Sequence, residues 1–109
     1  MPQITPIVMC QYRVLPERED TFRKLCSEHD QVVRRLGLVT DAPTQFYRGA
    51  DAQGRPFYVK IFSWSSAEAV ERAHQHPEVL AVWERLEPCC EARDGLPGME
   101  FPHVEALPI

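Results

Sequence analysis

The chain has 109 residues, of which 44% are hydrophobic and 26% are charged, and its formal net charge at pH 7 is −4. This length suits a single domain, residues 1–109, with one hydrophobic core, and the composition is that of a folded protein rather than a disordered one. Acidic residues are spread along the chain and no basic stripe is present, which argues against nucleic acid and membrane surfaces as partners.

The N-terminal segment and the cysteines both bear on the compartment. The segment Met1-Pro2-Gln3-Ile4-Thr5-Pro6 lacks the basic start and apolar run of a secretory signal, and no apolar stretch approaches the ~20 residues that cross a bilayer. The four cysteines form neither a Cys-x-x-Cys pair nor a regular disulfide framework: they are Cys10, Cys26, Cys89 and Cys90. We therefore expect free thiols and a cytoplasmic protein.

Apolar patterning in the first half of the chain predicts a strand, a helix and a hairpin. Residues 4–15 form an apolar run typical of a strand buried on both faces, and Pro16 then opens a helix that extends to about Leu36. The apolar stripe of that helix comprises Phe22, Leu25, Cys26, His29, Val32, Val33 and Leu36. Two strands follow, over residues 44–48 and 56–64, with a glycine-containing turn between them.

The second half predicts an interrupted helix and a closing strand. Ser65 and Glu68 have the spacing of a capping box at the helix start, and Pro77 divides the helix in two. After a polar loop over residues 91–98, residues 99–107 read as the last strand. Because Pro102 has no N–H to donate, that strand is expected at a sheet edge or with a bulge.

This order of elements predicts an α+β fold of the ferredoxin-like βαββαβ type, with an antiparallel sheet and both helices on one face. The opposite face is left uncovered, although the first and third strands are apolar on both sides. A second copy of the chain could cover it by packing sheet on sheet, so we expect a homodimer.

Three motifs give the chain a resemblance to a known family. They are Val14-Leu15-Pro16-Glu17 before the helix that carries Phe22, Phe62-Ser63-Trp64-Ser65-Ser66 at the end of the third strand, and the segment from Ala67 to His74 followed by His76-Pro77. Over essentially its whole length the chain resembles the antibiotic biosynthesis monooxygenase-like domains of the dimeric α/β-barrel superfamily. The resemblance implies a monooxygenase that needs no cofactor and acts on a small aromatic or polyketide-like molecule, with Tyr12, His74 and His103 orienting the substrate and moving a proton.

The histidines predict where the site lies. His74 falls on the apolar face of the second helix and is expected to point towards the sheet, as a hydrogen-bonded core residue or as the base of a pocket. His103 and Glu105 share one face of the last strand. We therefore expect a pocket between the sheet and the helices, whose further ligand-binding residues are His29, Trp64, Trp83, Phe101 and Glu105.

Several other functions stay open at this point. The same pocket could belong to a dimeric binding or accessory domain that catalyses nothing. His74 also resembles, in its helix position, the histidine that binds haem iron in the haem-degrading branch of the superfamily, although the first strand offers Gln11, Tyr12 and Arg13 where that branch has an asparagine. His103 and Glu105 with another imidazole could bind a divalent metal, but no spacing fixes that geometry, and neither metal nor cofactor is predicted.

Overall fold

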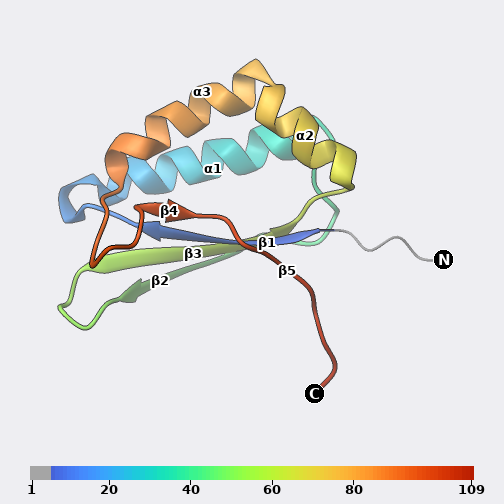
Figure 1. The fold of residues 1–109 in the computed structure, drawn as a ribbon. Helices are drawn as coiled ribbons and strands as arrows, with labels where there is room; N and C mark the ends of the chain where they lie inside the picture. The colour runs from blue at the N-terminus through green and yellow to red at the C-terminus, as the bar shows by residue number, and fades with distance from the viewer. Residues whose placement is uncertain (1–5) are drawn as a thin grey trace.

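The computed structural model describes residues 6–109, which form one antiparallel sheet with helices over one of its faces (Figure 1). Its elements are β1 (Ile7–Arg13), α1 (Glu19–Arg35), β2 (Gln45–Ala50), β3 (Pro56–Ser63), α2 (Ala67–Gln75), α3 (Pro77–Leu86), β4 (Met99–Glu100) and β5 (His103–Val104). The strand order is β2-β3-β1-β4, and β5 also pairs with β1. The predicted ferredoxin-like fold is confirmed. The sheet is open in the single chain.

The first helix forms as its apolar stripe predicts. A turn of 3-10 helix over Pro16–Arg18 precedes α1, whose buried residues include Phe22, His29 and Val33. The helix ends where Gly37 adopts a φ of 71°, a left-handed conformation that residues with a Cβ rarely accept. The expected glycine stop is therefore present, and the stripe of α1 lies against the sheet.

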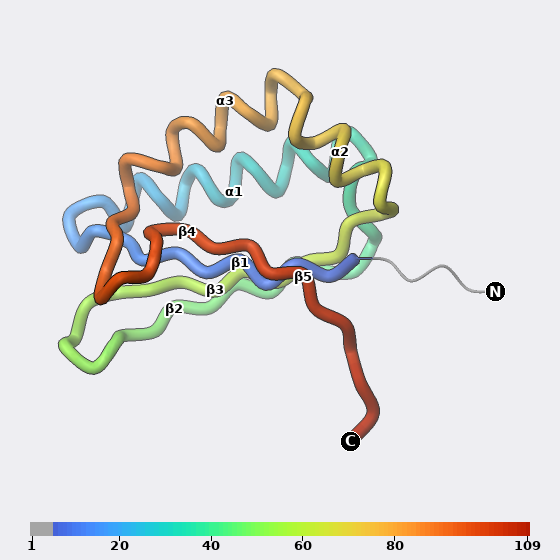
Figure 2. The backbone as a smooth tube through the Cα atoms, viewed as in Figure 1, coloured from blue at the N-terminus to red at the C-terminus, as the bar shows by residue number. Residues whose placement is uncertain are grey.

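The second helix begins one residue later than predicted and is divided at the predicted proline. Ser66 is the N-cap of α2, and its side chain accepts a hydrogen bond from the backbone N–H of Ala69 at 3.1 Å. The capping box assigned to Ser65 and Glu68 is wrong, because the Ser65 hydroxyl instead donates to the carbonyl of Gly37. At Pro77 the chain changes direction and α3 starts (Figure 2).

The last strand is shorter than predicted and broken in two. β4 and β5 both pair with β1 at the edge of the sheet, and Phe101 and Pro102 separate them. The carbonyl of Pro102 still accepts from the N–H of Met9 at 3.0 Å. Proline cannot return the second bond of a ladder, which accounts for the interruption and for the edge position.

The two faces of the sheet differ in burial. On β1 and β3 every second residue is buried against the helices, including Val8, Tyr12 and Phe62. The alternate residues, such as Met9 and Ile61, are only half-buried. The expectation that the first strand is buried on both faces is therefore wrong for the single chain, because its helices cover one face alone.

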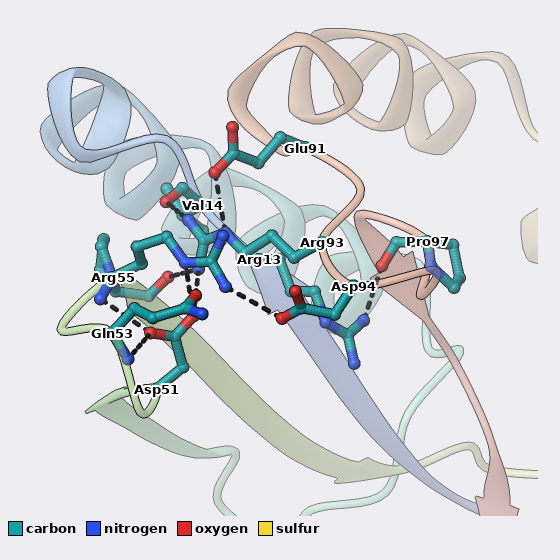
Figure 3. A network of polar contacts seen from close by, with 10 residues as sticks. Arg13, Val14, Asp51, Gln53, Arg55, Glu91, Arg93, Asp94 and Pro97 are labelled. Carbon is teal, nitrogen blue, oxygen red and sulfur yellow. Dashed lines mark hydrogen bonds and ion pairs between the residues drawn. The ribbon is translucent and has the colours of Figure 1, made fainter.

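A buried arginine closes the end of the sheet near the β2–β3 turn (Figure 3). The Arg93 guanidinium donates to the carbonyls of Val14 at 2.6 Å and Pro56 at 2.7 Å, and also to the Glu91 carboxylate. Asp51 lies 3.6 Å from the same guanidinium. The loop after α3 is thereby attached to β3 and to the end of β1.

Two further predictions concern the thiols and membrane spans. All four cysteines lie within residues 6–109 and are free thiols, as expected. Across the same residues, the helices are all too short or too polar to span a bilayer.

Candidate functional site

A cavity of about 340 Å³ lies between the helix-facing side of the sheet and the helices α1, α2 and α3. Its volume is within the range of small-molecule sites in proteins. The residues that line it are Val8, Cys10, Tyr12, His29, Phe62, Trp64, Ala73, His74, Val79, Leu80, Trp83, Phe101 and His103. The expected position between sheet and helices is thus where a cavity occurs.

Aromatic rings form much of the cavity wall. Phe62 and Trp64 meet edge to face with ring centroids 4.9 Å apart, and Trp83 packs on Phe101 at 4.7 Å. Tyr12 contacts Phe101 from the first strand at 5.8 Å. Such walls offer large, rigid apolar surfaces of the kind that bind planar ligands.

Trp64 brings an unused hydrogen-bond donor to this wall. Its side chain is buried, and its indole Nε1 has no hydrogen-bond partner within the described residues. A buried donor without an acceptor costs about 1–3 kcal/mol.

A buried lysine lies directly behind the cavity wall. The Nζ atom of Lys60, on β3, is 3.2 Å from Nδ1 of His29, on α1, and both side chains are buried. The same Nζ lies 5.9 Å from the ring centroid of Tyr12 and 5.5 Å from that of Phe62. Lys60 is therefore enclosed by residues that line the cavity.

The environment fixes the protonation of His29 and Tyr12. Burial, together with the charge of Lys60, lowers the pKa of His29 to about 3. A neutral His29 that accepts from Lys60 at Nδ1 must carry its proton on Nε2, so the ring keeps one N–H to donate. Burial raises the pKa of Tyr12 well above its usual value, with smaller contributions from nearby thiols, so its hydroxyl stays protonated.

His74 and His103 lie at the opening of the cavity rather than inside it. Both line the cavity, yet both side chains are exposed, as is Leu80 beside them. The expectation that His74 points into the interior is wrong, because Ala69 and Ala73 form the buried side of α2. Two exposed imidazoles, one from α2 and one from β5, thus line the cavity.

One predicted site residue is not brought to the cavity. Glu105 follows the end of β5, is exposed, and is not among the lining residues, because the strand that was to align it with His103 stops at Val104. The prediction that Glu105 belongs to the pocket is therefore wrong. Across residues 6–109 no three histidine, cysteine or acidic side chains are grouped so as to hold a metal ion.

The sequence interpretation missed Lys60. A lysine in a strand usually points to solvent, and Lys60 received no role. Its position nevertheless repeats the two-residue period of Tyr58 and Phe62, which both face the helices. This alternation could have predicted that Lys60 faces the helices.

The comparisons with known proteins bear on the fold. No family description and no curated protein matches the sequence. Solved structures do match. A cofactor-independent oxygenase from Streptomyces nogalater, SnoaB, has a TM-score of 0.71 at 17% identity, with 96% of this chain and 95% of that one covered.

Two further matches are described without a function. A conserved protein from Methanosarcina mazei Go1 has a TM-score of 0.71 at 12% identity, covering 93% of this chain and 91% of that one. A dimeric ferredoxin-like protein of unknown function from Jannaschia sp. CCS1 has a TM-score of 0.67 at 15% identity, covering 94% and 100%. Several other matches are named antibiotic biosynthesis monooxygenases. The resemblance drawn from the sequence is thus confirmed at the level of the fold.

Proposed function

We propose that this protein is a monooxygenase that needs no cofactor and acts on a small aromatic or polyketide-like molecule bound in the cavity between the sheet and the helices. The observation that carries the proposal is the cavity itself, in which aromatic walls and two exposed imidazoles surround one space. The fold shared with a cofactor-independent oxygenase supports the same reading.

The proposed chemistry begins with a proton transfer at the entrance. His74 or His103 takes a proton from an acidic C–H or O–H group of an electron-rich substrate, since imidazole is suited to this exchange near neutral pH. The anion then reacts with molecular oxygen. The substrate supplies the electrons, so that one oxygen atom enters the product and the other leaves as water without a separate reductant.

An interior donor has a different part in the proposal. The protonated Tyr12 hydroxyl can donate to the oxygen of the substrate on which negative charge develops. Fixed donors in a dry cavity stabilise such charge more strongly than water does. The aromatic pair Trp83 and Phe101 would hold the ring plane.

The active form is proposed to be a cytoplasmic homodimer. The side of the sheet away from the helices carries the half-buried residues Ile7, Met9, Val59 and Ile61, an apolar surface that a second copy would cover. A structural relative is a dimeric ferredoxin-like protein. Free cysteines suit a reducing compartment.

Oxygen uptake tests this function. Purified protein is mixed with a panel of hydroxynaphthalenes and hydroxyanthracenones in an oxygen-electrode cell, and the products are analysed by mass spectrometry. We expect catalysed uptake and a product that has gained one oxygen atom and lost two hydrogen atoms, which leave in the water formed. His74→Asn and His103→Asn should each slow it. His76→Asn is the matched control, because His76 caps α3 outside the cavity and asparagine can keep that cap.

Two outcomes would favour the alternatives. Saturable binding of these compounds with no catalysed uptake would support a binding or accessory domain. A Soret shift on adding haem, abolished by His74→Asn, would support the haem-degrading branch instead.

A further inference from the structure

Lys60 is a buried basic side chain that no acidic side chain of the described residues pairs with. It is 2% exposed, and within residues 6–109 no carboxylate lies within ion-pair distance of its Nζ. Its hydrogen-bond partner, His29, is a neutral imidazole. A buried charge without a partner is costly, so a structure that keeps one calls for an explanation.

The other polar neighbours of Lys60 do not supply the missing negative charge. Cys10 faces it across the β1–β3 ladder, and Cys26 on α1 is close enough to feel its charge. Burial raises the pKa of both thiols, that of Cys26 to about 11, so they remain neutral. Tyr12 also keeps its proton.

The cavity lining offers hydrogen-bond donors but no acid. None of its lining residues within 6–109 is aspartate or glutamate. His29, held by Lys60 at Nδ1, carries its remaining proton on Nε2. Tyr12, whose ring lies over Nζ, adds a hydroxyl. A molecule that brings negative charge into this space would complete the pair that Lys60 lacks.

We propose that the cavity selects aromatic molecules that carry a negative charge, as a carboxylate or a phenolate, and that Lys60, acting through His29, is the positioning residue that sets this preference. The inference rests on the binding site proposed above and adds the charge of its ligand. In a low-dielectric interior the attraction extends over several ångströms, and Lys60 does not need to touch the ligand.

A pair of ligands of equal shape tests the preference. Naphthalene-2-carboxylate and naphthalene-2-carboxamide differ in charge but hardly in size, and their binding to the intact protein can be followed by calorimetry at pH 7. We expect the carboxylate to bind about tenfold more tightly or better, as a unit charge in a partly shielded interior allows. In Lys60→Gln, which keeps an N–H donor for His29, the preference should fall to near unity with amide binding little changed.

Matched variants separate charge from structure. Lys24→Gln removes the chain's other lysine, which is exposed on α1, and should leave the preference intact. Lys60→Arg keeps the positive charge and should keep the preference for the carboxylate. If Lys60→Gln does not fold, the double variant Lys60→Met with His29→Leu replaces donor and acceptor together and should likewise lose the preference.

The outcomes distinguish this inference from the proposed function. Equal binding of the two ligands, or a preference that survives Lys60→Gln, would overturn the role of Lys60 and leave the aromatic site standing. Failure of both ligands to bind would overturn the site and this inference together.

Discussion

Lys60 Nζ and His29 Nδ1 lie 3.2 Å apart, and this contact joins β3 to α1 beneath the cavity wall. The pair is neutral on the histidine side, since the pKa of His29 is lowered to about 3. The unfolded chain would bind a proton at His29 below pH 6.5, whereas the folded protein would not. The contribution of His29 to the free energy of unfolding is therefore greatest above pH 6.5. It decreases as the pH falls from 6.5 towards 3.

We expect the free energy of unfolding to decrease between pH 6.5 and pH 5 by up to ~1.4 kcal/mol per pH unit from this one residue. Urea unfolding at a series of pH values measures the slope. His29→Gln, which can still accept from Lys60, should lack that part of it. An identical slope in the variant would contradict the assignment of His29 as a buried neutral imidazole.

Arg93 should contribute strongly to stability although it lies outside the cavity. Arg93→Met would leave the carbonyls of Val14 and Pro56 without their buried donor and would remove one of the two cations beside Asp51, which keeps Arg55 at 2.8 Å. We expect a loss of about 3–5 kcal/mol in urea unfolding. Arg85→Met is the control, because the Arg85–Glu28 pair is exposed and should contribute less than ~1 kcal/mol. Equal losses in the two variants would refute this role.

The open side of the sheet should hold the dimer. Ile61→Asp places a charge in the middle of its half-buried apolar residues, and we expect light scattering to change from a dimer mass to a monomer mass at micromolar concentration. Gln31→Asp, exposed on α1, should remain dimeric. A monomeric wild-type protein would contradict the proposal from the start.

Sequence patterns predicted the elements better than the details of the site. The periodicity of α1, the glycine stop at Gly37 and the break at Pro77 are local effects, and each appears where the sequence placed it. The exposure of His74 depends on how α2 is rotated against the sheet. That rotation is set by packing of Ala69 and Ala73, which local spacing does not determine.

The placement of Lys60 shows a second limit of the sequence. In a strand whose residues alternate between two faces, a lysine is buried only if the helices cover its face. It also needs a hydrogen-bond partner on the opposite element, as His29 is for Lys60. That contact joins residues 31 positions apart. The prediction for Glu105 was wrong for a related reason, since the pairing of β5 with β1 ends one residue before it.

His74 should affect binding without affecting folding. Because His74 is exposed at the entrance, His74→Leu should change the free energy of unfolding by no more than ~0.5 kcal/mol. Loss of its hydrogen bond to a ligand should weaken binding of a hydroxynaphthalene by about two- to tenfold, measured by fluorescence titration. Strong destabilisation with unchanged binding would make His74 a structural residue instead.

A crystal structure of the protein with a bound hydroxynaphthalene would show directly whether the cavity is the binding site. We expect electron density for the ring inside the cavity, beside Trp83 and Phe101. A cavity closed by its own side chains, with the ligand elsewhere on the surface, would contradict this expectation.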